Sequence, residues 1–293
     1  MFTGTYTAIV TPFRKGVLDE PALERIVKAQ IKGGVDGIVP VGTTGESPTL
    51  DYEEHVRVIE LAVQFANKKV KVLAGTGGNS TTEAIYLTKA AEEAGADGSL
   101  QVAPYYNKPT QEGVFQHFSA IAKATKLPII LYSIPGRCGI EIGVDTTKRL
   151  AAAHKNIVGM KEAGGNADRV SQLRAALGPK FVILSGDDSL TLPFMAVGAQ
   201  GVISVASNVV PKQISAMVRA FASGKIAAAQ KLHAQLYPLF KDLFIETNPV
   251  PAKAALAMMG MIEEECRLPL VAMSAKNKEA LRATLRSAGL LKN

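Results

Sequence analysis

Short apolar runs rich in Val, Ile and Leu alternate along the chain with longer segments in which apolar residues recur every three or four positions. The first pattern is typical of strands buried on both faces, and the second of amphipathic helices. The alternation occurs eight times, and the predicted strands cover Thr5–Pro12, Gly37–Val41, Lys71–Gly75, Gly98–Ala103, Pro128–Ser133, Ile157–Ala163, Phe181–Gly186 and Gly201–Ala206. Each predicted strand is followed by a helical pattern, so strand, loop and helix repeat in that order.

Several predicted helices begin with a capping residue, which fixes the direction of the repeat. Asp19 precedes Glu20-Pro21, Thr110 precedes another helical segment, and Ser80 is followed three residues later by Glu83, the spacing of a capping box. The units follow one another without a long linker or a shift in composition. This favours a closed TIM (β/α)8 barrel over an open sheet, and one such barrel accounts for most of a 293-residue chain.

The end of the chain has a different pattern, because no convincing strand follows the predicted helix Pro211–Ala222. Three further helices are predicted, at Ala227–Phe244, Val250–Met259 and Ala275–Ser287. We therefore expect a barrel at residues 1–224 that carries the active site and a C-terminal helical extension at 225–293 packed on it. A region rich in Ala, Leu and Met at helical spacing is more often core or subunit interface than a cofactor site.

Composition and charge narrow the range of partners. The net charge of +7, from 33 basic and 26 acidic residues, is spread along the chain. It can attract small anions but forms no stripe for a nucleic acid. The start, Met1 to Gly4, lacks a basic segment followed by an apolar one, and only Cys138 and Cys266 are present, so we expect a cytoplasmic protein with free thiols. No stretch approaches the roughly 18 uncharged residues that span a bilayer, so a membrane is not an expected partner.

Lys161 is the most informative residue, because it interrupts the apolar run Ile157–Ala163. A lysine with little water around it has a pKa below the usual value of about 10.4, and its neutral amine can attack a carbonyl to form an imine. Gly159 and Ala163 share its face of the strand and leave space for a substrate. The alternative is a lysine whose stem lies along the strand while its ammonium reaches solvent at the sheet edge.

Other polar residues follow the predicted strands, at the end where a barrel builds its active site. The backbone amides and hydroxyls of Thr43 and Thr44 could surround a carboxylate, although an ordinary capped turn explains the pair equally well. Arg137 offers a fork of donors that suits a carboxylate, and one of the nearby tyrosines, Tyr105, Tyr106 or Tyr132, could move protons with its hydroxyl. Together with Lys161, these groups indicate carbon–carbon bond formation or cleavage through an enamine.

The sequence gives no sign of a metal or a nucleotide. The four histidines, His55, His117, His154 and His233, show no spacing typical of metal ligands. The segment Gly75–Ser80 resembles a dinucleotide loop, but it lacks the last glycine of that motif. We therefore expect no cofactor, and a metal-dependent aldolase is disfavoured.

Three motifs at strand ends carry a resemblance to a known family: Gly42-Thr43-Thr44-Gly45-Glu46, Tyr132 followed by Pro135, and Lys161-Glu162. Over essentially its whole length the chain resembles the pyruvate-dependent class I aldolase superfamily, which includes the N-acetylneuraminate lyases. Within it, the chain is most similar to the dihydrodipicolinate synthase family of lysine biosynthesis. That closer similarity is carried by Arg137, by Pro104–Asn107 and by Asn248–Lys253.

The resemblance implies a role for each residue of the predicted site. Lys161 would form the Schiff base with pyruvate, Tyr132 would move protons at the imine, and Thr44 and Tyr106 would complete a relay, with Tyr106 reaching in from a neighbouring subunit. Arg137 would guide the carboxylate of aspartate 4-semialdehyde. The residues that bind substrate would be Thr43, Thr44, Arg137, Gly186 and Ile203.

The implied reaction gives 4-hydroxy-tetrahydrodipicolinate, the first committed step of lysine and diaminopimelate biosynthesis, in a homotetramer built as a dimer of dimers. An allosteric site for L-lysine would use Pro48, Tyr52, His55, Gly77, Asn79, Glu83 and Tyr105. Pro48 and Tyr52 differ from the residues that the family frequently has at these two positions.

Two further departures, Ser133 and Cys138, are expected to line the path of the aldehyde. The alternatives are a lyase for a sialic acid or another sugar-derived keto acid, which Arg137 disfavours, and a non-catalytic barrel that binds a ligand.

Overall fold

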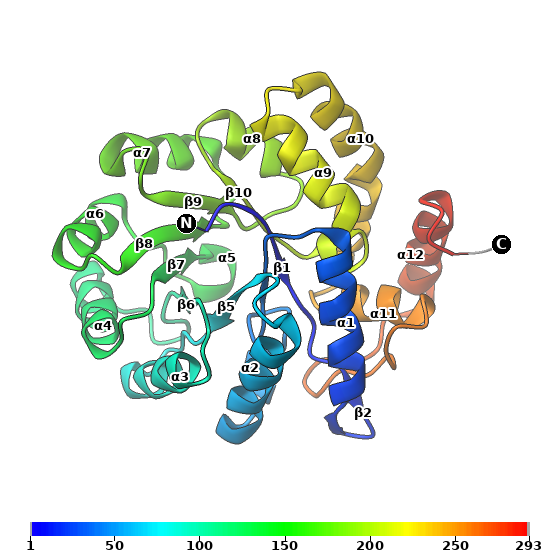
Figure 1. Ribbon diagram of the computed structural model, residues 1–293, viewed down its shortest axis with the longest axis horizontal. Helices are drawn as coiled ribbons and strands as arrows, with labels where there is room; N and C mark the ends of the chain where they lie inside the picture. The colour runs from blue at the N-terminus through cyan, green and yellow to red at the C-terminus, as the bar shows by residue number, and fades with distance from the viewer. Residues whose placement is uncertain (1, 292–293) are drawn as a thin grey trace.

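Eight parallel strands close into a barrel in the computed structural model, which describes residues 2–291. Around the barrel the strands follow the order β1-β10-β9-β8-β7-β6-β5-β4 (Figure 1). Their bounds are β1 Gly4–Ala8, β4 Gly37–Val39, β5 Lys71–Gly75, β6 Gly98–Val102, β7 Ile129–Ser133, β8 Ile157–Glu162, β9 Val182–Ser185 and β10 Gly201–Ser204. The predicted TIM barrel is confirmed. Residues 1, 292 and 293, which the expected domain limits include, lie outside the described part of the chain.

Helices follow the strands and form the outer layer of the barrel (Figure 1). Their bounds are α1 Glu20–Gly33, α2 Tyr52–Ala66, α3 Thr81–Glu93, α4 Gln111–Ala124, α5 Pro135–Cys138, α6 Val144–Ala153, α7 Ala167–Leu177, α8 Thr191–Ala196 and α9 Pro211–Ala222. The short 3-10 helices η1 Ser47–Thr49 and η2 Ala206–Asn208 follow β4 and β10. The predicted N-caps are present, since Asp19, Ser80 and Thr110 each accept a hydrogen bond from the first turn of a helix; of the capping box expected at Ser80, only the bond from the Glu83 amide is formed.

Two separate apolar clusters hold the barrel together. The smaller one fills the inside of the barrel and includes Tyr6, Leu73, Ile130, Leu184 and Ile203. The larger one lies between the strands and the helices, as expected when successive strand residues point to opposite sides. The interior is therefore packed, and a polar side chain that enters it is desolvated.

A small antiparallel hairpin, β2 Phe13–Arg14 and β3 Val17–Leu18, was not predicted, because strands of two residues are too short to show a periodic pattern. Its turn places Lys15 and Gly16 at positive φ, 54° and 82°. Both backbone amides of the turn donate to the Glu265 carboxylate, at 2.8 and 2.6 Å. The hairpin is therefore tied to the last part of the chain.

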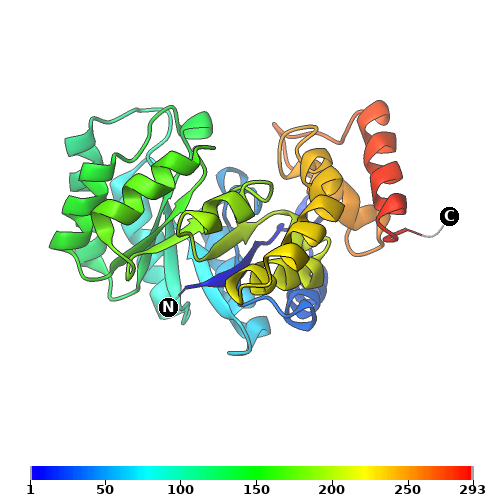
Figure 2. The same ribbon diagram turned by 90° about the horizontal axis from the view of Figure 1, so that it is seen from above.

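That last part contains α10 Ile226–Asp242, α11 Val250–Met258 and α12 Ala275–Ser287, close to the three predicted helices. In both ribbon views α12 lies at the end of the molecule farthest from α4 and α6 (Figure 2). Helix α11 is buried along most of its length, so it packs as part of the core rather than as a surface helix.

Candidate active site

Lys161 and Tyr132 lie side by side at the carboxyl ends of β8 and β7, where they are direct partners in the strand register. The Lys161 Nζ atom is 4.1 Å from the centroid of the Tyr132 ring. Both side chains are buried, with exposed fractions of 6 % and 5 %. The alternative in which the Lys161 ammonium reaches solvent at a sheet edge is therefore wrong, because the sheet is closed and the side chain lies inside it.

Burial determines the charge of Lys161. Loss of hydration is the main reason that the pKa of this amine falls to about 7; the Asp188 carboxylate partly opposes the fall, and the nearby Arg137 adds to it. Among the described residues, no ion pair joins Lys161 to a carboxylate. A substantial share of the amine is therefore neutral at neutral pH, as a nucleophile that forms an imine requires.

Asp188 is buried beneath the loop after β10, and its oxygens have other partners. It accepts hydrogen bonds from the Ser204 hydroxyl and from the backbone amides of Val205 and Ala206, at 3.0 and 2.9 Å. Burial raises the pKa of this carboxyl, and the three donors oppose that shift. Asp188 thus acts on Lys161 through its charge at a distance.

Gly186, which follows β9, provides the space for the lysine side chain. A Cβ atom at this position would lie 3.0 Å from Lys161 Cε and 2.7 Å from Ala163 Cβ. Gly159 has a different function from the one we expected, because a Cβ atom there would meet the Val182 carbonyl oxygen at 2.6 Å. Its small size permits close packing of two strands and does not leave room for a substrate.

The tyrosine beside the lysine is held in its protonated form. Burial raises the pKa of Tyr132 to about 12, while a hydrogen bond with the Thr43 hydroxyl and the charge of Arg137 oppose this shift. The phenol therefore keeps its proton at neutral pH and can donate it.

The two neighbouring threonines point to different partners. Thr43 contacts the Tyr132 phenol, whereas the buried Thr44 hydroxyl accepts a hydrogen bond from the Asn248 side-chain amide at 3.0 Å. The loop turns tightly after the two threonines, with Glu46 at a φ of +54° and its amide donating to the Thr43 carbonyl at 3.1 Å. The hydroxyl against the phenol is thus that of Thr43, where the resemblance implied Thr44.

A cavity opens at this end of the barrel. Thr43, Tyr132 and Arg137 line it, and the predicted effector residues Pro48, Gly77 and Tyr105 line the same space. The remaining lining residues are Val41, Gly42, Ser47, Gly75, Leu100, Val102, Ile134 and Cys138.

Arg137 lies on the short helix α5, and its guanidinium donates to the Asn248 carbonyl at 3.2 Å. Ile203, in β10, is part of the cluster inside the barrel.

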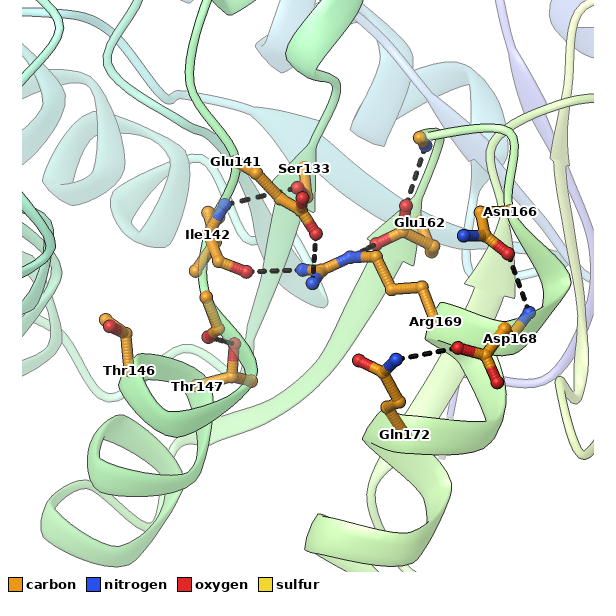
Figure 3. A network of polar contacts seen from close by, with 12 residues as sticks. Ser133, Glu141, Ile142, Thr146, Thr147, Glu162, Asn166, Asp168, Arg169 and Gln172 are labelled. Carbon is orange, nitrogen blue, oxygen red and sulfur yellow. Dashed lines mark hydrogen bonds and ion pairs between the residues drawn. The ribbon is translucent and has the colours of Figure 1, made fainter.

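Ser133 and Cys138 were both expected along the path of the aldehyde, and only Cys138 lines the cavity. Ser133 follows Tyr132 on the strand and faces the opposite side, where its hydroxyl accepts from the Ile142 amide at 3.3 Å (Figure 3).

Behind the two strands, Figure 3 shows a buried network that the sequence did not reveal. Glu162, which follows Lys161, accepts from Arg169 Nε at 2.8 Å and from the Gly164 amide at 2.7 Å. Arg169 also pairs with Glu141 and donates to the Ile142 carbonyl. Since Ile142 binds Ser133, this network joins the ends of β7 and β8 and fixes the strands that carry Tyr132 and Lys161.

The residues expected to bind an effector lie on neighbouring loops and helices. His55 Nε2 is 2.8 Å from the Gly75 carbonyl, and the Asn79 amide donates to the Tyr105 carbonyl at 3.2 Å. Burial and the charge of Glu83 raise the pKa of Tyr105.

The next tyrosine, Tyr106, is 87 % exposed, and its backbone has a φ of +70°. Tyr52 is half exposed, and its ring lies 5.6 Å from that of Tyr86.

Two contacts link the threonine loop to the last part of the chain, and sequence reasoning missed both. Besides the bond from Asn248 to Thr44, Lys253 Nζ lies 2.5 Å from Glu46 Oε1, with both side chains fully buried. The Arg267 amide donates to the other Glu46 oxygen at 3.0 Å. The partners are about two hundred residues apart in sequence, so local periodicity cannot reveal them.

The part of the chain that the structure describes contains no cluster of three or more His, Cys, Asp or Glu side chains that could hold a metal ion. Within the same residues, no helix is both long and apolar enough to cross a membrane. A buried lysine with a lowered pKa, a phenol beside it and a hydroxyl-bearing loop at the carboxyl end of a barrel define a Schiff-base-forming (β/α)8 enzyme of the class I aldolase type.

Comparison with known proteins narrows this class. The dihydrodipicolinate synthetase family model matches residues 1–288, and the chain belongs to that family. A 4-hydroxy-tetrahydrodipicolinate synthase of Sulfurihydrogenibium sp. is 55 % identical over 293 residues, all of both chains. The structure of the enzyme of that name from Methylacidiphilum fumariolicum SolV has a TM-score of 0.98 and 59 % identity, over 99 % of this chain and 96 % of that one. A structure from Cyanidioschyzon merolae with lysine bound has a TM-score of 0.96 and 43 % identity, over 99 % of each chain.

The family predicted from the strand-end motifs is thus confirmed, and so is the prediction of an enzyme of the lyase class. The predicted function, a synthase at the first committed step of lysine biosynthesis, is confirmed by the same relatives. They give no support to a sialic-acid lyase or to a non-catalytic barrel.

Proposed function

We propose that Lys161 forms an imine with pyruvate and that the derived enamine attacks aspartate 4-semialdehyde. The observation that supports this most strongly is the desolvated Lys161 amine 4.1 Å from the Tyr132 ring. The neutral amine adds to the keto carbon, and water leaves. Loss of a proton from the methyl group gives the enamine, whose carbon forms the new bond to the aldehyde while the aldehyde oxygen takes up a proton. The amino group of the second substrate then closes the ring at the imine carbon and releases Lys161, giving 4-hydroxy-tetrahydrodipicolinate.

Tyr132 supplies the protons of these steps. Its pKa of about 12 keeps the phenol protonated, so it can donate to the oxygen that leaves during imine formation and recover the proton later. The relay continues to Thr43, whose hydroxyl contacts the phenol, and to Tyr106 of a second subunit. We therefore assign to Thr43 the relay position first expected for Thr44.

Thr44 acts as a ligand of the pyruvate carboxylate, together with the backbone amides of the same loop. Gly186 and Ile203 lie around the bound pyruvate. Arg137, which lines the cavity, binds the carboxylate of the aldehyde substrate in a bidentate manner.

A homotetramer, built as a dimer of dimers, completes the site. The 87 % exposure of Tyr106 supports this, because a tyrosine with so little cover in its own subunit is available to a neighbouring one. Sedimentation of the wild-type enzyme, and restored activity on mixing Tyr106→Phe subunits with Lys161→Ala subunits, test this assignment. Monomers with full activity would contradict it.

L-Lysine acts as an effector at the site formed by Pro48, Tyr52, His55, Gly77, Asn79, Glu83 and Tyr105. Support comes from the lysine-bound relative and from the cavity that three of these residues share with Arg137. A lysine titration of the wild type and of His55→Ala tests it, with inhibition expected only in the wild type.

Residues 1–224 form the catalytic barrel and 225–293 the extension, the enzyme works in the cytoplasm, and the imine supplies the chemistry without a metal or other cofactor. Full activity after treatment with a chelator is the expected result.

The imine itself is tested by the intact mass after pyruvate and sodium borohydride. We expect one reduced pyruvate adduct per subunit, located at Lys161 by peptide mapping and missing from Lys161→Ala. An adduct on Lys253 instead, or none at all, would refute the assignment.

A further inference from the structure

Asn248 lies in the segment before α11 and contacts two residues of the proposed site. Its side-chain amide donates to the Thr44 hydroxyl at 3.0 Å, and its backbone carbonyl accepts from the Arg137 guanidinium at 3.2 Å. The side chain is 4 % exposed and Thr44 is 3 % exposed, so water does not compete for the first contact.

We propose that Asn248 is a positioning residue that orients the Thr44 hydroxyl as a hydrogen-bond donor toward the pyruvate carboxylate. This rests on the proposed function, in which Thr44 binds that carboxylate. A hydroxyl has one hydrogen to donate, and it can accept from other groups. Because the Asn248 amide occupies an acceptor position of Thr44, the hydroxyl hydrogen is left for another partner. A carboxylate is the substrate group that such a donor binds.

The position of Asn248 is itself held by the extension. Helix α11 begins two residues later, and Lys253 in that helix forms the buried ion pair with Glu46 of the threonine loop. The loop is thus fixed to the extension at Glu46 and oriented at Thr44. The two contacts of Asn248 come from different groups, the side chain and the backbone, so substitution separates them.

Asn248→Ala removes the amide and keeps the carbonyl that binds Arg137. We expect the apparent KM for pyruvate to rise about tenfold, because the loss of one buried hydrogen bond costs about 1.4 kcal/mol. The apparent KM for aspartate 4-semialdehyde should stay within about twofold, since the Arg137 contact remains. Asn277→Ala is the matched control, because its amide binds Glu246, two residues before Asn248, at 2.8 Å and makes no hydrogen bond to Thr44 or Arg137 among the described residues. The control should leave both constants unchanged.

Asn248→Asp is the sharper variant, because its shape is nearly that of asparagine. An ionised carboxylate can only accept, so Thr44 must donate to it and is lost as a donor to pyruvate. The rise in the pyruvate KM should therefore exceed that of Asn248→Ala. The increase in the pyruvate KM, relative to the wild type at each pH, should become smaller as the pH falls, because the protonated carboxyl can donate to Thr44 again. A residue that merely fills space predicts wild-type behaviour for this variant, and that result would overturn the proposal.

A cycle with Thr44→Val separates this inference from the proposed function. In the Thr44→Val background, Asn248→Ala should have no further effect on pyruvate, whereas additive effects would contradict the proposal. If Thr44→Val alone leaves the pyruvate KM unchanged, the role of Thr44 is wrong and the inference fails with it. If Thr44→Val raises that constant and neither Asn248 variant does, only the inference fails. Melting temperatures identify any variant that is misfolded, and Asn248→Asp then decides.

Discussion

Lys161 and Lys253 are both buried in an enzyme of 293 residues, and their surroundings give them opposite functions. Each ammonium lies over an aromatic ring, Tyr132 at 4.1 Å and Phe13 at 4.3 Å. Only Lys253 has a carboxylate partner, Glu46 at 2.5 Å. Without such a partner, the desolvated Lys161 has a pKa of about 7 and can act as a nucleophile. Burial alone therefore does not make a lysine reactive, because a paired carboxylate turns the same side chain into a structural element.

The strongest way to separate the two lysines is to replace Lys161 by Met, which has a similar volume. Turnover should fall roughly 10⁴-fold or more, because the covalent route is lost. Stability should rise, on the order of 2–4 kcal/mol below pH 7, since the unfolded lysine holds its proton more tightly than the folded one. The gain should be complete below the folded pKa of about 7 and disappear as the pH rises through the unfolded value of 10.5. Urea titrations across this range measure it, and a loss of stability would contradict the account.

Lys253→Met should have the opposite effect on stability. Removal of the cation leaves Glu46 charged and buried, which costs about 3–5 kcal/mol. The double variant Lys253→Met/Glu46→Gln should recover much of that loss, because no unpaired charge remains. Denaturant titration of the single and double variants provides the test, and equal stabilities would show that the pair has no structural function.

Gly186→Ala should slow imine formation at Lys161 without changing the charged groups near it. The new methyl would lie 3.0 Å from Lys161 Cε, so the amine must shift. Crowding of this size costs about 1–3 kcal/mol, which corresponds to a slowing of imine formation by about tenfold or more. Rapid-quench trapping with pyruvate measures the rate. An unchanged rate would mean that the lysine is not held as closely as the contacts indicate.

The smallest effects concern the charges near Lys161. Asp188 raises the pKa of Lys161 and Arg137 lowers it. Asp188→Asn should therefore move the pH midpoint of imine formation downward, and Arg137→Ala should move it upward. Shifts of the same sign in both variants would contradict this electrostatic assignment.

The fold could be predicted from the sequence because its signals are local. The strand Lys71–Gly75 is a continuous apolar run after its first residue, and Ile157–Glu162 is one up to its last two residues. Each unit also has its own turns and caps. The hairpin at Phe13 to Leu18 escaped prediction because it is too short to carry a pattern.

The sequence revealed those site residues whose type is unusual at their position, such as the lysine in an apolar strand. Which threonine hydroxyl meets which partner was not predictable, because only the folded loop brings Thr43 to Tyr132 and Thr44 to Asn248. The partners of Glu46 and Thr44 come from the other end of the chain, and three-dimensional packing alone brings them together.

The pH dependence of the rate of imine formation with pyruvate shows whether burial without a carboxylate partner makes Lys161 the nucleophile. We expect the rate, measured by rapid-quench mass spectrometry, to rise with pH and to level off with a midpoint of about 7, the pKa of the desolvated Lys161 amine. A rate that continues to rise toward about 10.4, the value of an ordinary solvated lysine, would contradict the claim that burial without a carboxylate partner makes Lys161 the nucleophile.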